Sequence, residues 1–454
     1  KTDWALGGCG GHKSPVLCIG EEQPKNCFTE LQVLKGHFDI VRFLVQIDDF
    51  RCASAGDDGL VLVWNVETGE RLQELRGHSQ QITAITTFTC SNGLMSHTSL
   101  ITASSDRSLS LWDPDTGNRV QTISDLQSSV KCLLVLERLC VWFSGGEELC
   151  VWDRDFQLRL SHLSVCLLAP DAAVCSRITA LIELPKNCIA AAMDKEIMIY
   201  RLTVSTDSTL SVAEMRCLSD HQDQIRALIN VNDGLFASGS HAGELIIWDA
   251  IDWNILAYEH ILWEESQTCA QAEIRLAAPK PSEMSIQHLT TNGKLILAAV
   301  GSGLYVYSIL TKTVVAYRKV AHDSNVLHTM LLSDSELMSC SEDGSVRMWE
   351  IQELPLTAEP ASPGFFGMWT FGRPNKQTGP PTKKVVDVPN IRTLELTGDL
   401  IGHSGAVQMF ASFKENGLVT CSTDHLLILW KNGARQSCLR SLALFQKLEE
   451  NGGL

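Results

Sequence analysis

One short pattern recurs through most of this chain and restricts the possible folds more than any other feature. A cluster of small residues is followed by a turn, an alternating apolar stretch and an aromatic residue, as in SAGDDGLVLVWN at 54–65 and TCSTDHLLILWK at 420–431. The units end at the following aromatic residues: Trp64, Trp112, Trp152, Tyr200, Trp248, Tyr307, Trp349 and Trp430. Most are spaced near the roughly 40–45 residues of a four-stranded propeller blade. The sequence therefore predicts an all-β fold, an eight-bladed β-propeller.

The way the ring closes can also be predicted. Apolar residues alternate with polar ones at period two, as expected for strands, and one sheet cannot bury both of its faces alone. The segment 28–34 (FTELQVL) precedes Gly36-His37 as an outer strand would, and no further strand follows Trp430. We expect segment 28–34 to complete the eighth blade, because this removes an open sheet edge.

The four clearest units share a His and an Asp at fixed places. The Asp lies six residues before the Trp, and the His lies upstream after a Gly or Ala. The sets are His37, Asp58 and Trp64; His78, Asp106 and Trp112; His322, Asp343 and Trp349; and His403, Asp424 and Trp430. Such residues beside a Ser or Thr could form a catalytic triad. A buried polar group without a partner costs about 1–3 kcal/mol, however, so we expect them to satisfy one another in a structural network.

The weaker units lack part of this pattern. Gly146 and Gly301 stand at the Asp position of the third and sixth units, the fifth unit has His221 but Ala242, and Asp194 of the fourth has no obvious His. We expect these blades to be looser, which is not evidence of catalysis. The His and Asp positions together with the WD and GH dipeptides resemble WD repeats, and the resemblance covers residues 28–431. The predicted fold is therefore a WD40 propeller.

Composition and motifs exclude several classes of function. The net charge of −16 disfavours binding to nucleic acid or to anionic lipid. The 16 Cys residues form no C-x-x-C pair, so we expect reduced thiols in a cytoplasmic protein and no metal site. No run approaches the roughly 18 apolar residues of a membrane span, and no phosphate-binding loop or hydrolase motif occurs. We expect no enzymatic activity and no cofactor.

A long insertion after Trp349 is the first candidate interaction element. Residues 353–395 are rich in Pro, Gly and Lys, which predicts a disordered loop. It contains the motif GFFGMWTFGR, whose candidate partner-binding residues are Gly364, Phe365, Phe366, Met368, Trp369, Phe371 and Arg373. Either this motif folds back onto the propeller, or its aromatic anchors insert into a pocket of a partner.

The C-terminus is the second candidate. Apolar residues recur at three-residue steps, which predicts a helix over 436–454 with Ser437 at its start and Gly452-Gly453 at its end. The repeating residues are Leu439, Leu442, Phe445 and Leu448. This helix either packs on the closing blade or presents one face to a partner.

These features divide the chain into segments. We expect a flexible N-terminal segment over 1–27, a propeller over 28–435 that carries the insertion, and the terminal helix. A further excursion at 251–287 exceeds the length of a blade, and we expect it to be structured.

Longer motifs resemble one family of WD-repeat subunits. They are IGEEQ at 19–23, DIVRFLVQIDDFR at 39–51, GELIIWDA at 243–250, AHDSNVLH at 321–328, the GFFGMWTFGR motif and LFQKLEENG at 444–452. The resemblance implies a non-catalytic scaffold in a cytosolic complex with two longin/DENN-domain proteins, which is linked to amyotrophic lateral sclerosis, autophagy and small-GTPase regulation. It implies direct contact with one DENN-domain partner through the end blades and the C-terminal helix. It also implies recruitment to lysosomes when Gly364–Arg373 binds a PQ-loop cationic-amino-acid transporter.

Two other classes of function stay open at this point. Substrate receptors of cullin ubiquitin ligases carry W-D-x-R at a strand end, but here Trp152-Asp153 is followed by Arg154 and Asp155. A hydrolase within a propeller would need a metal or carboxylate cluster on the axis. Co-purification with a DENN-domain partner rather than a cullin adaptor would decide the first question.

Overall fold

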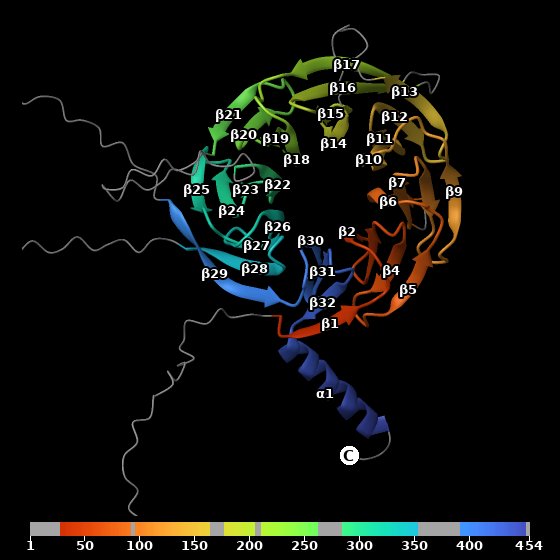
Figure 1. Cartoon of the computed structure of the whole chain (residues 1–454), viewed down its shortest axis with the longest axis vertical. Helices are drawn as coiled ribbons and strands as arrows, with labels where there is room; N and C mark the ends of the chain where they lie inside the picture. The colour runs from red at the N-terminus through yellow and green to blue at the C-terminus, as the bar shows by residue number, and fades with distance from the viewer. Residues whose placement is uncertain are drawn as a thin grey trace, which may run out of the picture.

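Four-stranded antiparallel blades follow one another around a central axis (Figure 1). The computed structural model describes residues 28–91, 96–163, 177–204, 210–261, 284–352 and 391–450. Within these ranges the strands form six separate four-stranded sheets and one eight-stranded sheet that joins two blades. The all-β, eight-bladed propeller predicted from the repeat is confirmed.

The first four blades use the strands in chain order from the axis outward (Figure 1). Blade 1 comprises β2 (Val41–Gln46), β3 (Arg51–Gly56), β4 (Val61–Asn65) and β5 (Arg71–Leu75). Blade 2 comprises β6 (Ile82–Ser91), β7 (Ser96–Ser104), β8 (Leu109–Trp112) and β9 (Arg119–Ile123). Blade 3 comprises β10 (Cys132–Leu136), β11 (Val141–Gly145), β12 (Glu148–Asp153) and β13 (Leu158–Leu163). Blade 4 comprises β14 (Ile178–Leu184), β15 (Cys188–Met193), β16 (Glu196–Val204) and β17 (Leu210–Leu218).

The remaining blades follow the same order except at the closing blade. Blade 5 comprises β18 (Ile225–Asn232), β19 (Leu235–Ser240), β20 (Glu244–Asp249) and β21 (Ile255–His260). Blade 6 comprises β22 (Ile286–Thr291), β23 (Leu295–Val300), β24 (Gly303–Ser308) and β25 (Thr313–Arg318). Blade 7 comprises β26 (Val326–Leu331), β27 (Glu336–Ser341), β28 (Ser345–Gln352) and β29 (Arg392–Ile401). Blade 8 comprises β30 (Val407–Ser412), β31 (Leu418–Ser422), β32 (Leu427–Lys431) and, as its outer strand, β1 (Glu30–Leu34).

The N-terminal strand closes the ring as the sequence predicts. Strand β1 pairs antiparallel with β32 from Glu30 opposite Lys431 to Leu34 opposite Leu427. The Lys431 ammonium also donates to the Glu67 carbonyl in blade 1 at 2.6 Å. The first and last parts of the propeller are therefore held together by a shared sheet.

The apolar core lies mainly between neighbouring blades. One cluster joins blades 8 and 1 through Leu34, Val41, Trp64 and Leu427, all of which are buried. Similar clusters occupy other seams. Because each sheet buries its faces against its neighbours, no blade has a complete core of its own.

Blades 6 and 7 have an additional connection at their outer strands. Strand β29 starts with a short parallel pairing to β25, with Ala316 opposite Arg392 and Tyr317 opposite Thr393. The Arg318 guanidinium donates to the Leu394 carbonyl at 3.0 Å. The predicted insertion 353–395 is therefore too long at its C-terminal end, because 392–395 belong to a strand that pairs with both β25 and β28. Residues 353–390, including the aromatic motif, lie outside the described residues.

The C-terminal helix α1 (Gly433–Glu450) begins earlier than predicted. The Asn432 side-chain oxygen accepts a hydrogen bond from the Arg435 backbone N–H at 3.1 Å, which is the geometry of an N-cap. Ser437, the predicted cap, lies inside the helix, where its carbonyl accepts from the Ser441 hydroxyl. The predicted boundary at 435/436 is wrong for this reason, and the predicted stop at Gly452-Gly453 lies outside the described residues.

Two further expectations can be compared with the strands. Residues 251–261 of the predicted excursion are the last turn and outer strand of blade 5, and 286–287 begin β22, so the excursion is shorter than 251–287. Its middle, residues 262–283, and the N-terminal segment 1–27 lie outside the described part of the chain. None of the helices in the described ranges combines the length and the apolar character needed to cross a bilayer.

Candidate functional site

The repeated His, Asp and Trp meet inside the blades. In blade 1, His37 Nδ1 lies 2.8 Å from Asp58 Oδ2, and His37 Nε2 lies 2.8 Å from Ser54 Oγ. Trp64 Nε1 donates to the same Ser54 Oγ at 2.8 Å. The side chains of His37 and Asp58 are fully buried, so solvent and substrate have no access to this pair.

The other three strong units repeat this arrangement. A Thr or Ser hydroxyl lies between the imidazole and the indole in each of them. The sets are His78, Asp106, Thr102 and Trp112; His322, Asp343, Ser339 and Trp349; and His403, Asp424, Thr420 and Trp430. The structure thus brings together the His, Asp and Trp that the spacing grouped. In each blade, these contacts join the connection that carries the His to the second strand, which carries the Ser or Thr, and to the third strand, which carries the Trp.

The charges of these groups follow from their surroundings. Burial alone would raise the pKa of Asp58, but hydrogen bonds from His37, Leu60 and Phe38 outweigh it and hold the pKa below its usual value. Burial lowers the pKa of His78 and His403, although a carboxylate lies beside each. At neutral pH blades 2 and 8 therefore contain a carboxylate beside a neutral imidazole, and both nitrogens of His78 and of His403 have a partner.

Blade 5 contains a partner that the sequence interpretation missed. His221 Nδ1 lies 3.2 Å from Glu244 Oε2, and His221 Nε2 lies 2.6 Å from Ser238 Oγ. Ser240 and Tyr258 also donate to the Glu244 carboxylate, each at 2.8 Å. The prediction that this blade lacks an acidic partner is wrong, because Glu244 stands two residues after Ala242 and its longer side chain reaches the same histidine.

The direction of the strands places both predicted interaction elements on one side of the ring. Adjacent strands of a blade are antiparallel, so the turns after its first and third strands lie at one end and the other connections lie at the opposite end. We call the first side the insertion face. Residues 353–390 follow β28, the third strand of blade 7, and α1 follows β32, the third strand of blade 8. Both elements therefore leave the insertion face from adjacent blades.

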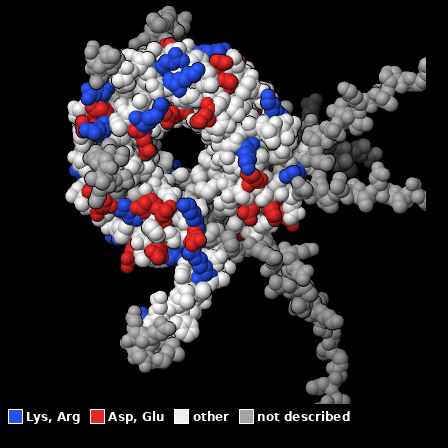
Figure 2. Space-filling view, turned by 180° about the vertical axis from the view of Figure 1, so that it is seen from behind, with Lys and Arg blue, Asp and Glu red and all other residues white. Residues whose placement is uncertain are grey.

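Helix α1 projects away from the ring (Figure 1), and its Arg435 and Arg440 side chains contact Glu415 and Glu30 of blade 8. Leu439, Leu442 and Phe445 are 46%, 53% and 55% exposed. In Figure 2 the visible surface of this helix is largely uncharged beyond its root. The alternative that the helix packs its apolar residues on the closing blade is therefore wrong for these three residues, and the side chain of Leu448 is not among those the structure describes.

A cavity of about 550 Å³ also opens on the insertion face, at the seam between blades 6 and 7. Its lining comes from turns of both blades and from the two strand ends that flank residues 353–390. The apolar lining residues are Leu295, Ile309, Leu310, Val315 and Ile351, and the charged ones are Lys294, Asp334 and Arg392. Sequence periodicity could not predict this cavity, because its walls come from connections that are distant along the chain.

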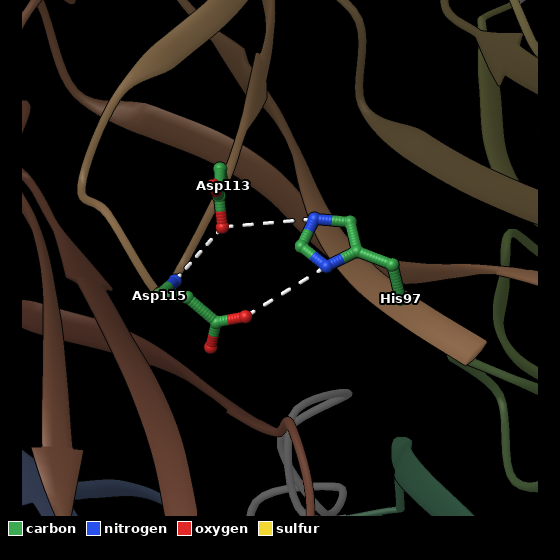
Figure 3. A group of neighbouring side chains, drawn as sticks. All are labelled: His97, Asp113 and Asp115. Carbon is green, nitrogen blue, oxygen red and sulfur yellow. Dashed lines mark hydrogen bonds and ion pairs between the residues drawn. The ribbon is translucent and has the colours of Figure 1, made fainter. Parts of the chain in front are cut away.

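One surface group contains side chains of the kind that bind metals (Figure 3). His97 Nε2 lies 3.6 Å from Asp113 Oδ1, and His97 Nδ1 lies 3.7 Å from Asp115 Oδ2. Asp113 already accepts from the Asp115 backbone and the Thr116 hydroxyl, and the Arg51 guanidinium pairs with Asp115. Because a fixed cation already neutralises part of this group, its contacts fit a surface ion network better than a metal site.

Comparisons with known proteins agree with this architecture. The WDR41 β-propeller family model matches residues 3–440. The chain is similar to human WD repeat-containing protein 41, with 55% identity over 99% of this chain and 98% of the relative, and to the mouse protein, with 51% identity over the same shares. A computationally designed protein, Ika8, shares the fold, with a TM-score of 0.60 and 20% identity over 88% of this chain and 98% of its own. The WD-repeat scaffold is thus common to the sequence, the structure and the relatives, and the chain belongs to the WDR41 family of β-propeller proteins.

Proposed function

We propose that this chain is the non-catalytic subunit that connects a DENN-domain partner to the lysosome. The observation that carries the proposal is the row of exposed apolar side chains on α1, Leu439, Leu442 and Phe445, on a helix that projects away from the closed ring (Figure 1). An amphipathic helix that presents such a row commonly lays it in an apolar groove of another protein. The partner is one of the two longin/DENN-domain proteins that the family resemblance implies.

The root of α1 supports docking at the closing blade. Arg440 pairs with Glu30 on β1 at 3.1 Å, and Arg435 donates to the Glu415 carbonyl in blade 8 at 2.6 Å. Leu31 and Val33 on the outer face of β1 are 49% and 40% exposed. A partner that binds α1 therefore also reaches the edge of blade 8 beside it.

The insertion supplies the second half of the proposal. Its motif Gly364–Arg373 recruits the complex to lysosomes by binding a PQ-loop cationic-amino-acid transporter, and the complex supports autophagy and small-GTPase regulation there. Both ends of the insertion are fixed, because Ile351 pairs with Leu394 where β28 and β29 meet. The motif is thus attached to a rigid base, on the same face of the ring as α1.

The two halves are tested by affinity purification of the full chain from cells. Leu442→Asp together with Phe445→Asp should abolish recovery of the DENN-domain partner, because a charged group would have to enter an apolar groove. Gln446→Ala on the exposed helix is the matched control and should recover the partner like the wild type. Full recovery with the double variant would overturn the proposal for α1.

The insertion is tested with Trp369→Ala together with Phe371→Ala. This variant should lose the transporter and lysosomal localisation while retaining the DENN-domain partner. Gln377→Ala in the same insertion is the control and should retain both. Unchanged recruitment of the aromatic variant would overturn the proposal for the motif, and recovery of a cullin adaptor in place of the DENN-domain protein would favour the substrate-receptor function instead.

A further inference from the structure

The cavity between blades 6 and 7 has no role in the binding events proposed above. Its floor is apolar: Ile351 is 7% exposed, and both Leu295 and Val315 pack against the core cluster of the seam. Leu310 at its rim is 89% exposed. A volume of about 550 Å³ lies within the usual range of pockets that hold small apolar ligands or a few large side chains.

The cavity is positioned at the two ends of the long insertion. Ile351 is the next-to-last residue of β28 and Arg392 is the first of β29, and both line the cavity. The segment 353–390 thus leaves from the cavity wall and returns to it. The aromatic motif begins roughly a dozen residues after Ile351, which corresponds to about 40 Å of extended chain. Its connection on the Arg392 side is longer, so neither connection prevents the motif from reaching the cavity.

We propose that the aromatic motif Gly364–Arg373 of the same chain docks in this cavity when no partner holds it. The proposal rests on the proposed function only in naming the competing partner. A tethered segment is present near its site at a high effective concentration, so it outcompetes a free peptide of equal affinity. Phe365, Phe366, Trp369 and Phe371 gain by leaving water for an apolar floor.

A carboxylate at the rim of the cavity complements the positive charge of Arg373, the last residue of the motif. Lys294 and Asp334 form an ion pair at 2.6 Å across the two blades, and their side chains are 71% and 62% exposed. The Asp334 carboxylate can accept from the guanidinium of Arg373 when the aromatic residues occupy the floor. The docked motif is unavailable to the transporter. The apparent affinity of the chain for the transporter is therefore the intrinsic affinity multiplied by the fraction of molecules whose motif is free.

A peptide titration on the full chain tests this directly. The probe is a fluorescent peptide with the sequence of residues 361–376, and the receptor is the Trp369→Ala, Phe371→Ala double variant, whose own motif no longer competes. The peptide should bind this variant at least about tenfold more tightly than it binds the wild type if the wild-type motif is docked nine-tenths of the time. Adding Leu310→Asp to the double variant should abolish binding.

A matched substitution controls for the added charge. Val320→Asp changes another exposed apolar residue of the same seam that does not line the cavity, so it should leave peptide binding unchanged. Leu310 is exposed enough that its substitution should not alter the melting temperature, which checks folding. Absence of binding to the double variant, or binding that Leu310→Asp does not weaken, would overturn the proposal.

Recruitment of the transporter separates this inference from the proposed function. In an otherwise wild-type chain, Leu310→Asp should increase transporter binding, because it frees the motif. If Trp369→Ala with Phe371→Ala abolishes recruitment while Leu310→Asp leaves it unchanged, the proposed function stands and the docking inference fails. If recruitment survives loss of the motif while the peptide still binds the cavity, the docking stands and the proposed function of the motif fails.

Discussion

His221 Nδ1 lies 3.2 Å from Glu244 Oε2, and both side chains are only 1% exposed. The pair occupies in blade 5 the place that His and Asp occupy in blades 1, 2, 7 and 8. Burial alone would raise the pKa of Glu244, but hydrogen bonds from Gln222, Ser240, Tyr258 and His221 outweigh it and hold the pKa below its usual value. A glutamate thus replaces the usual aspartate.

Removing the charge of this carboxylate tests the replacement. Glu244→Gln should lower the free energy of unfolding by about 1–3 kcal/mol, because a buried amide cannot accept all the hydrogen bonds that the carboxylate accepts. Asp58→Asn should have an effect of similar size in blade 1. Urea unfolding at pH 7.5 measures both, and an unchanged midpoint for Glu244→Gln would contradict the role of Glu244.

Two inner-strand histidines predict a loss of stability in mild acid. The His288 and His328 rings lie 4.2 Å apart, and His288 Nδ1 accepts from the Thr329 backbone N–H at 3.2 Å. Burial lowers the pKa of His288 to about 4, and burial together with His288 lowers that of His328 well below 6.5. In the unfolded chain these two histidines take up protons below about pH 6.5, whereas in the folded chain they stay neutral until the pH falls to their lowered pKa values. Their contribution to the free energy of unfolding is therefore fully present above about pH 6.5 and is lost as the pH falls toward about 4.

His288→Gln tests this account, because Gln can accept the same hydrogen bond but does not titrate. Between pH 6.5 and 4, the wild type should lose about 2 kcal/mol more than the variant in the free energy of unfolding. His425→Asn, at an exposed turn position with φ of 69°, is the control for removing a histidine. Parallel pH profiles of His288→Gln and the wild type would show that the pair is not responsible.

The parallel pairing between blades 6 and 7 predicts a local effect. Thr393→Pro removes a backbone N–H where β29 meets β25 and β28. Amide hydrogen exchange in β25 should rise about tenfold or more, while strands of blades 2 and 3 keep their protection. Thr393→Val leaves the backbone intact and should exchange like the wild type. Unchanged exchange in the proline variant would mean that the pairing does not stabilise the seam.

Local patterns and long-range contacts differ in what the sequence can predict. The His, Asp and Trp of four blades follow a fixed spacing within one unit, so the spacing alone is enough to group them. Glu244 escapes such a pattern because its reach to His221 depends on side-chain length and on the fold of the turn. Asn432 and Ser437 are both good N-cap residues, and only the path of the chain after β32 decides between them.

Contacts between distant segments account for the other differences. The extent of β29 depends on its pairing with β25 and β28, which no local pattern records. The cavity at the same seam is built from turns of two blades together with Ile351 and Arg392. The predicted closing strand is an exception, because a propeller with a missing outer strand at one end requires a matching strand at the other.

Closure of the ring by β1 is the central structural claim, since β1 completes blade 8, contributes to the seam with blade 1 and lies beside α1. The most direct measurement is the thermal unfolding of the chain that lacks residues 28–35, monitored by circular dichroism. Val33→Thr is the control, because this side chain is 40% exposed and the strand remains. We expect the control to melt cooperatively near the wild-type temperature and the deletion to show no cooperative transition. A cooperative transition of the deletion variant within a few degrees of the wild type would contradict the closed ring.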